Sequence, residues 1–340
     1  MSDAAFDAFT AFLEGGQEFL LTAHVDPDGD AVGSCLGLEL ALQYLGKETQ
    51  VVLESPVPVS LEFLPGADRI RRPTTLAKRF THAFVLDSSS LDRVGTVAAV
   101  NLAPDAHVAV IDHHWGNEGF GSPRLVNPEA SATAELIYDL IEFLHVPIAP
   151  EIATNLYTGI LSDTGGFRFA NTSARTLRVA ARLVEHGARA AEVAESLYAT
   201  KTAPSLRILG LALASLETKS GGRIGAMTIS RAMFEDAGAT PEDADGIVQY
   251  AKALAGAKVG VLIQEIAPGE IRASLRSDGT VDVNEVASRF GGGGHRNAAG
   301  LRVRGSLGVV KEDIFRALEH AMNGGPPPSG MKGGPASPRG

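Results

Sequence analysis

The sequence predicts an α/β protein with two domains, an N-terminal domain built on a parallel sheet and a smaller α/β domain after it. The chain has 340 residues, of which 44% are hydrophobic and 21% charged, so it carries enough apolar mass for two cores. In the first half, short apolar runs alternate with segments of helical periodicity, which is typical of a parallel sheet with helices on both faces.

The first predicted domain, residues 1–186, opens with a helix over 3–14, where apolar residues recur at helical spacing. A buried strand then runs into the turn Asp26-Pro27-Asp28-Gly29-Asp30, and Gly46 ends the helix that follows. The predicted strands are 18–25, 51–53, 83–87 and 107–112, and the remaining predicted helices are 31–45, 132–144, 152–161 and 173–186.

The second predicted domain, residues 216–324, is joined to the first by a helical connector over 187–215 that Pro204 interrupts. Pro268-Gly269 predicts a hairpin turn. Residues 325–340 cannot bury enough apolar surface to order themselves, so we expect a disordered tail. The predicted strands are 223–230, 258–266 and 271–275, and the predicted helices are 243–254, 283–290 and 310–322.

The net charge of −10 argues against a protein that coats long nucleic acid through a general basic field. Cys35 is the single cysteine, which excludes an internal disulfide and fits a reducing compartment. The N-terminus lacks the basic start and apolar core of a signal peptide, and no uncharged apolar run is long enough to span a bilayer. The sequence therefore predicts a soluble cytoplasmic protein without a membrane partner.

Acid and imidazole side chains follow the ends of the predicted strands. Asp28 lies in the turn after the first strand, Asp87 ends the strand 83–87, and His113 follows the strand 107–112. Ligands in parallel α/β sheets bind beyond the carboxyl ends of the strands, so these motifs are expected to meet at one edge. Taken singly, each motif is more typical of a turn or a solvated loop, but together they favour a metal site.

Carboxylate and imidazole ligands suit two divalent ions, with manganese preferred and magnesium or cobalt as alternatives. The absence of further cysteines argues against a structural zinc site. Two ions about 3.5–4 Å apart would turn a bound water into a nucleophile and offset the charge that develops when a phosphate ester is hydrolysed. The six predicted ligands are His24, Asp28, Asp30, Asp87, His113 and Asp163.

These motifs resemble the DHH phosphoesterase superfamily, named for the triplet Asp112-His113-His114. The resemblance includes the segment from His24 to Ser34, Asp87 and Asp163. Near the C-terminus, Phe290-Gly291-Gly292-Gly293-Gly294-His295 followed by Ala298-Ala299-Gly300 is similar to the substrate motif of the associated DHHA1 domain. The resemblance covers nearly the whole chain except the tail. The two-domain layout is most similar to the nanoRNase and pAp-phosphatase subfamily, which degrades very short RNA.

The resemblance implies how the ligands divide. His24, Asp28 and Asp87 would hold one ion, and Asp30, His113 and Asp163 would hold the other, with Asp87 bridging the two. It also implies two catalytic residues that are not ligands. His114 would face the substrate phosphate and stabilise charge or protonate the leaving oxygen, and Asp112 would orient the neighbouring histidine.

A phosphate-binding site is predicted in the second domain. Consecutive residues without Cβ let backbone N–H groups approach an anion, although a lone glycine run is more often a flexible loop. A cleft between the domains would then favour short substrates. The predicted contacts are Arg276, Ser277, Gly292, Gly293, Gly294 and His295. Arg93 is a further phosphate contact or a surface salt bridge, and Trp115 stacks on a base or packs partly buried.

The leading hypothesis is a metal-dependent hydrolase of di- to pentaribonucleotides that also converts 3′-phosphoadenosine 5′-phosphate (pAp) to AMP. Its partners would be short RNA oligonucleotides and nucleotide bisphosphates, and a homodimer is left open. One alternative keeps the chemistry and takes linear or cyclic signalling dinucleotides such as pGpG, pApA or cyclic di-AMP. Another is a nonenzymatic nucleotide-binding module, which would require the loss of a ligand, and none is missing.

Overall fold

A computed structural model of the chain describes residues 3–323, so the predicted tail over 325–340 lies outside the described residues. The chain forms two compact units, Met1–Thr200 and Lys201–Gly340. The division falls inside the predicted connector: α7 (Ala190–Ala194) and the π-helical turn η5 (Glu195–Ala199) belong to the first unit, and α8 (Ala203–Ala214) belongs to the second.

The first unit is built on a five-stranded parallel sheet with the order β2-β1-β3-β4-β5, which confirms the predicted fold class. Every predicted strand is present, although β2 begins and ends a few residues before the predicted range. The edge strand β5 was not predicted, because three residues are too few to show a period. The bounds are β1 (Glu18–Thr22), β2 (Glu48–Val51), β3 (Phe80–Leu86), β4 (Leu102–Asp112) and β5 (Arg124–Val126).

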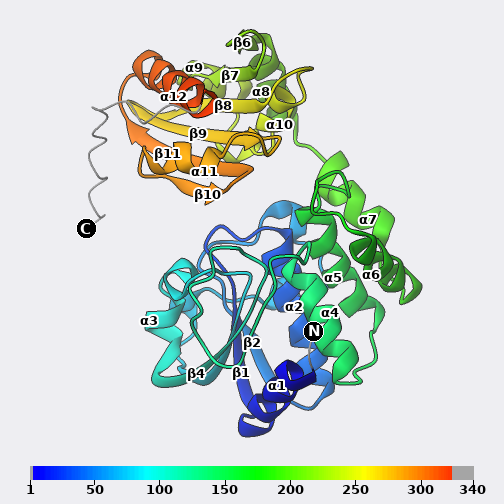
Figure 1. Ribbon diagram of the computed structural model, residues 1–340. Coiled ribbons are helices and arrows are strands. Elements are labelled where there is room, and N and C mark those ends of the chain that lie inside the picture. The colour runs from blue at the N-terminus through cyan, green and yellow to red at the C-terminus, as the bar shows by residue number, and fades with distance from the viewer. Residues whose placement is uncertain (1–2, 324–340) are drawn as a thin grey trace. The chain divides into compact units, whose positions relative to one another are not determined.

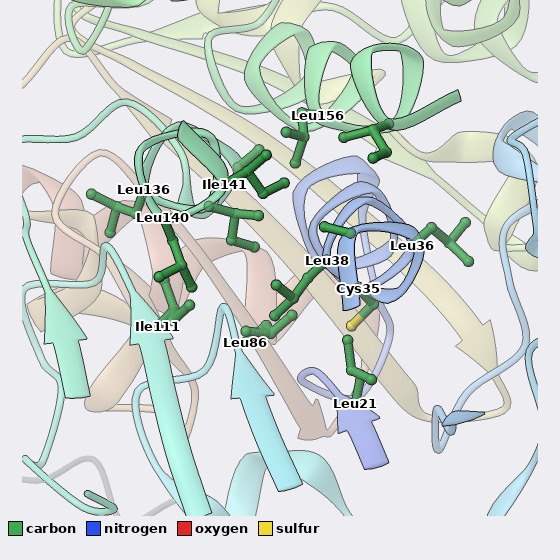
Figure 2. Packing of buried hydrophobic residues seen from close by; sticks show 14 of the residues in the cluster. Leu21, Cys35, Leu36, Leu38, Leu86, Ile111, Leu136, Leu140, Ile141 and Leu156 are labelled. Carbon is green, nitrogen blue, oxygen red and sulfur yellow. The ribbon is translucent and has the colours of Figure 1, made fainter. Parts of the chain in front are cut away.

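Long helices cover one face of this sheet, where Leu21, Leu86 and Ile111 point from the strands toward α2 and α4 (Figure 2). The neighbouring residues Leu20 and Val110 face the other side, as the two-residue period of a strand requires. On that side the cover is short, with α3 (Val97–Asn101) and the 3₁₀ turns η3 and η4, whereas η1 and η2 pack on the side of the long helices. The remaining helices are α1 (Asp3–Gly15), α2 (Gly29–Tyr44), α4 (Thr133–Phe143), α5 (Pro150–Asp163) and α6 (Ala174–Glu185); the 3₁₀ turns are η1 (Val59–Leu61), η2 (Ala67–Arg69), η3 (Pro73–Thr75) and η4 (Leu91–Val94).

Helices α2 and α5 cross at unusually close range because glycines lie at the contact. A Cβ at Gly33 would lie 2.3 Å from the backbone oxygen of Asn155, and a Cβ at Gly159 would lie 2.6 Å from Oδ1 of Asp30. No side chain larger than hydrogen fits at either position. The crossing places the first turn of α2 beside the last turn of α5, which ends at Asp163.

The second unit is a six-stranded mixed sheet with the order β10-β11-β9-β8-β7-β6, in which only β7 and β8 are paired in parallel. Helices α11 and α12 pack on one face and α8, α9 and α10 on the other (Figure 1). The bounds are β6 (Glu217–Lys219), β7 (Ile224–Ile229), β8 (Val259–Ala267), β9 (Glu270–Ser277), β10 (Gly293–His295), β11 (Ala298–Arg304), α9 (Arg231–Ala237), η6 (Glu242–Ala244), α10 (Val248–Lys252), α11 (Val283–Ser288) and α12 (Leu307–Met322).

Two local predictions are wrong. The helix expected over 243–254 is split into η6 and α10, because the chain turns at Gly246, whose φ of 82° is left-handed. Pro204 does not interrupt a helix but lies in the first turn of α8, after the N-cap Thr202, where the missing N–H costs nothing. Within residues 3–323, no helix combines the length and apolar character needed to cross a bilayer.

Candidate metal centre

The six predicted ligands come together at the carboxyl edge of the parallel sheet in the first unit. His24, Asp87 and His113 follow the neighbouring strands β1, β3 and β4. Asp28 and Asp30 lie at the start of α2, and Asp163 ends α5. The close crossing of α2 and α5 therefore adds three carboxylates to the groups that the strands deliver.

His24, Asp28 and Asp87 form the first group, with one ligand atom from each within 4.8 Å of the others. Nε2 of His24 lies 3.4 Å from Oδ2 of Asp87 and 4.0 Å from Oδ1 of Asp28. Nδ1 of His24 donates to the backbone oxygen of Val25 over 2.8 Å, so the tautomer leaves Nε2 unprotonated in the neutral ring. The ring therefore presents a ligand atom to the two carboxylates.

Asp30, His113 and Asp163 form the second group. Nε2 of His113 lies 3.1 Å from Oδ2 of Asp163 and 3.9 Å from Oδ2 of Asp30. The same nitrogen lies 3.5 Å from Oδ1 of Asp87, whose other oxygen faces His24. Asp87 thus presents one carboxylate oxygen to each group, which is the arrangement that a bridging ligand requires.

Asp87 reaches this position through a left-handed backbone with a φ of 51°. Its N–H donates to the backbone oxygen of Ile111, so the turn begins while the residue is still paired to β4. Aspartate is among the few residues other than glycine that adopt this conformation at modest cost. The turn directs the carboxylate into the buried space between His24 and His113.

Asp30 also caps a helix that begins about a hundred residues later in the chain. Its Oδ2 accepts the N–H of Thr133 over 2.6 Å, and its Oδ1 accepts the N–H of Ala134 over 3.0 Å. The N-cap residue of α4, Ala132, has no side-chain acceptor to offer. The hydroxyl of Thr133 donates to Oδ1 of Asp87 over 3.0 Å, so the start of α4 fixes two predicted ligands at once.

Asp112 contacts His114 rather than His113. Nδ1 of His114 donates to Oδ1 of Asp112 over 2.6 Å, and Asn117 donates to Oδ2 over 2.7 Å. Burial would raise the pKa of Asp112, but these two hydrogen bonds outweigh it and hold the pKa below its usual value. His114 Nδ1 lies 3.6 Å from Asp87, yet a nitrogen that donates to Asp112 cannot also coordinate a cation.

The electrostatics of the cluster fit a divalent cation. Burial lowers the pKa of His24, but Asp87 outweighs it and raises the pKa to about 9. Burial and the charges of Asp163 and Asp87 raise the pKa of Asp28 to about 6, although its side chain is 52% exposed. Burial and Asp87 also raise the pKa of Asp30. Without a cation, the cluster favours extra protons on His24, Asp28 and Asp30, which a divalent cation would replace. These oxygen and nitrogen donors are the set that manganese and magnesium prefer.

Two of the predicted contacts of the second unit, Arg276 and His295, lie in one row across its sheet. Arg276 pairs with Ala298 across β9 and β11, and Ala298 pairs with His295 across β11 and β10. Direct cross-strand partners point to the same face, so Arg276 and His295 share a face. Burial lowers the pKa of Arg276. Gly293 and Gly294 form an edge strand instead of an irregular loop, and packing itself requires Gly292, whose Cβ would lie 2.2 Å from the backbone oxygen of Gly300.

Ser277 has a structural role, since its hydroxyl oxygen accepts the backbone N–H of Gly279 over 3.0 Å. Arg93 lies exposed in η4 and forms no ion pair with any residue of the range 3–323, which removes the salt-bridge alternative. Trp115 is 78% exposed, so the alternative of a partly buried packing role is wrong. It follows the buried His114, in a turn closed by the N–H of Asn117.

The sequence did not predict the residues that support the ligands, above all Thr133 and Asn117. The hydroxyl residues Ser131 and Thr133 at the start of an apolar helix are a signal for a capped helix start, but they do not reveal which distant carboxylate meets them. Asn117 has no signal of its own in a glycine-rich loop.

Known protein families match both units of the chain. The N-terminal domain of the DHH family matches residues 18–160, and the DHHA1 domain matches residues 211–324. A Thermus thermophilus protein named bifunctional oligoribonuclease and PAP phosphatase NrnA is 38% identical over 306 residues, which are 87% of this chain and 90% of that protein. The chain belongs to the DHH family.

Other similar proteins also match most of this chain. A Bacillus subtilis protein of the same name is 28% identical over 84% of this chain and 88% of its own. Among solved structures, an exopolyphosphatase-related protein from Bacteroides fragilis superposes with a TM-score of 0.89 at 26% identity, covering 95% of this chain and 97% of that one. RecJ from Thermus thermophilus in complex with Mn²⁺ shares the fold with a TM-score of 0.53 at 16% identity, over 94% of this chain and 54% of RecJ.

Proposed function

We propose that this DHH protein is a metal-dependent phosphodiesterase that hydrolyses short oligoribonucleotides to mononucleotides and removes the 3′-phosphate of pAp. The observation that carries the proposal is Asp87, whose two oxygens face two separate groups of ligand atoms. The relatives named oligoribonuclease and PAP phosphatase match over most of their length and most of this chain, which supports carrying their substrates over.

The two groups would hold two divalent ions, with manganese as the preferred metal and magnesium or cobalt as alternatives. His24 and Asp28 would bind one ion, Asp30, His113 and Asp163 the other, and Asp87 both. When bound, such a pair supplies a water of lowered pKa and neutralises charge on the phosphate.

Residues of the chain would orient the substrate and handle protons. Asp112 holds the His114 ring with Nδ1 protonated, so Nε2 is the atom that would stabilise the phosphate or protonate the leaving oxygen. In the second unit, Arg276 and His295 share a sheet face and would bind a terminal phosphate, with Gly292 to Gly294 beside them. Arg93 remains a candidate phosphate contact.

The test is hydrolysis of a labelled diribonucleotide and of pAp by the purified, manganese-loaded protein. We expect mononucleotide from the first and phosphate from the second, with rates falling as the oligonucleotide lengthens. Asp87→Asn should abolish both activities, whereas Asp92→Asn, which changes an exposed carboxylate on η4, should keep them. If the wild-type protein releases neither product, the proposal is refuted.

Signalling dinucleotides are the second candidate. The cyclic-di-AMP phosphodiesterase GdpP of Geobacillus thermodenitrificans is 27% identical, and the match covers 94% of this chain but 50% of GdpP. Linear pApA and cyclic di-AMP therefore belong in the same assay. Faster hydrolysis of the cyclic compound than of the linear dinucleotides would favour this candidate over the first. A cytoplasmic location and a homodimer stay predictions, to be checked by fractionation and light scattering.

A further inference from the structure

A buried carboxylate that is not a predicted ligand lies in the first turn of α4. Glu135 is 1% exposed. Its Oε2 accepts the N–H of Ser131 over 3.2 Å, the hydroxyl of Ser131 over 2.7 Å and the hydroxyl of Thr176 over 3.2 Å. Its Oε1 lies 2.8 Å from Nε of Arg175, in an ion pair. A charge buried this deeply is tolerated only because these groups compensate it.

The segment that Glu135 holds, residues 130–133, contacts the metal centre at both of its ends. The backbone oxygen of Ala130 lies 3.3 Å from Nδ1 of His113. Thr133 donates its N–H to Asp30 and its hydroxyl to Asp87. Three predicted ligands therefore take their positions from a segment of four residues.

The segment also reaches Asp163, the fourth residue predicted to hold the second ion. The side-chain amide of Asn171 donates to the backbone oxygen of Ser131 over 3.0 Å and to the backbone oxygen of Asp163 over 3.1 Å. This bridge connects the segment to the end of α5. A shift of Ser131 would thus be felt at Asp163 as well.

The position of Glu135 in the first turn of α4 explains how it holds Ser131. A glutamate at the third helical position often reaches back to the N–H of the N-cap residue. Glu135 occupies that third position, but it reaches one residue further, to Ser131. The first two N–H groups of α4 go instead to Asp30. Glu135 therefore accepts the N–H of the chain just before α4, whereas Asp30, which lies in the metal centre, accepts the first two N–H groups of the helix.

We propose that Glu135 is a positioning residue for the metal centre: by anchoring residues 130–133 it sets the distances among Asp30, Asp87 and His113 that cation binding requires. The inference rests on the proposed function, because it takes the six-residue cluster to be a metal site. Glu135 itself would touch neither metal nor substrate, and it would act only through the segment and its hydrogen bonds.

The chain offers a matched control in Glu39 of α2. Glu39 is 2% exposed and pairs with a single arginine, Arg69, over 2.8 Å. It lies nine residues beyond Asp30 along α2, about 13 Å away, and its partner Arg69 is not in the cluster. Replacing either glutamate by glutamine removes a buried charge opposite an arginine, but only Glu135→Gln disturbs the segment behind the ligands.

The experiment compares wild type, Glu135→Gln and Glu39→Gln by manganese binding, followed through the electron paramagnetic resonance signal of free Mn²⁺, and by thermal unfolding of the metal-free proteins. We expect both variants to melt at lower temperature. Only Glu135→Gln should bind manganese more weakly, by about 10- to 100-fold, as is usual when a support of a metal ligand is lost. Excess manganese should restore hydrolysis by Glu135→Gln, because all six ligands remain.

Manganese affinity of Glu135→Gln within about threefold of wild type would overturn the inference and leave Glu135 a structural residue. An equal loss in Glu39→Gln would overturn it too, since the effect would then follow from stability alone. If Glu135→Gln fails to fold, Ser131→Ala, which removes one donor to Glu135, carries the same comparison. A wild-type protein that binds no manganese would instead refute the proposed function, so the two failures are distinguishable.

Discussion

Replacing Asp112 by asparagine should slow hydrolysis without releasing the metal. Asp112 accepts hydrogen bonds from His114 and Asn117 at 2.6 and 2.7 Å. Asparagine offers one acceptor oxygen, so one of the two donors would face an NH₂ group. Asn117 cannot reverse its amide cheaply, because its own oxygen accepts the N–H of Gly119 over 2.8 Å. The His114 ring would therefore lose its acceptor or change tautomer.

The size of the effect follows from the bond that is lost. A hydrogen bond to a charged group contributes about 1.5–3 kcal/mol. If that energy is expressed at the transition state, Asp112→Asn lowers kcat by about 10- to 150-fold. Because Asp112 contacts His114 and Asn117 and presents no oxygen to either ligand group, we expect manganese affinity to change by less than about threefold.

The assay is steady-state hydrolysis of a diribonucleotide at saturating manganese, with His114→Gln and the double variant measured in parallel. If Asp112 acts through His114, the double variant should be no slower than His114→Gln alone, because the two changes remove the same function. Additive losses in the double variant, or an unchanged kcat in Asp112→Asn, would refute the pairing of Asp112 with His114 as the catalytic unit.

Three further predictions follow from the site and its packing. Trp115→Ala should raise KM for dinucleotides by about 5- to 100-fold with little change in kcat, because an exposed indole beside His114 can stack on a base. Nucleotide binding should also quench the fluorescence of this single tryptophan, and an unchanged KM would exclude stacking. Manganese binding should release protons and strengthen from pH 6 to 9, because the pKa of His24 is raised to about 9 and that of Asp28 to about 6 in the metal-free protein. Calorimetry in buffers of different ionisation enthalpy measures the released protons, and an affinity that does not change with pH would contradict the prediction. Gly33→Ala should destabilise the first unit by about 1–3 kcal/mol in denaturant unfolding, since its Cβ would lie 2.3 Å from the backbone oxygen of Asn155. The control Gly210→Ala on α8 has open space around it and should be neutral or stabilising.

The sequence predicted which acid and imidazole residues come together, because they follow the ends of strands. An apolar run that stops at an aspartate, as at Asp87, shows both the strand and the residue that leaves it. Since parallel strands end at one edge, knowing three strand ends was enough to expect Asp28, Asp87 and His113 together. The sheet type followed from the same alternation of strands and helices.

What the sequence could not show depends on contacts between distant segments. Asp30 caps α4 across 103 residues, and no local pattern links the two. The buried Glu135 looks like an ordinary acidic residue in the first turn of a helix until Ser131 and Thr176 are seen to meet it. The glycines of β10 were expected to form a loop, because the strand propensity of glycine is low. Pairing with β11 overrides that propensity.

The most direct test of the metal centre is anomalous diffraction from crystals soaked in manganese. We expect two peaks about 3.5–4 Å apart. One should lie among His24, Asp28 and Asp87, and the other among Asp30, Asp87, His113 and Asp163. A single peak, or two peaks that do not share Asp87, would contradict the bridging role on which the proposed chemistry depends.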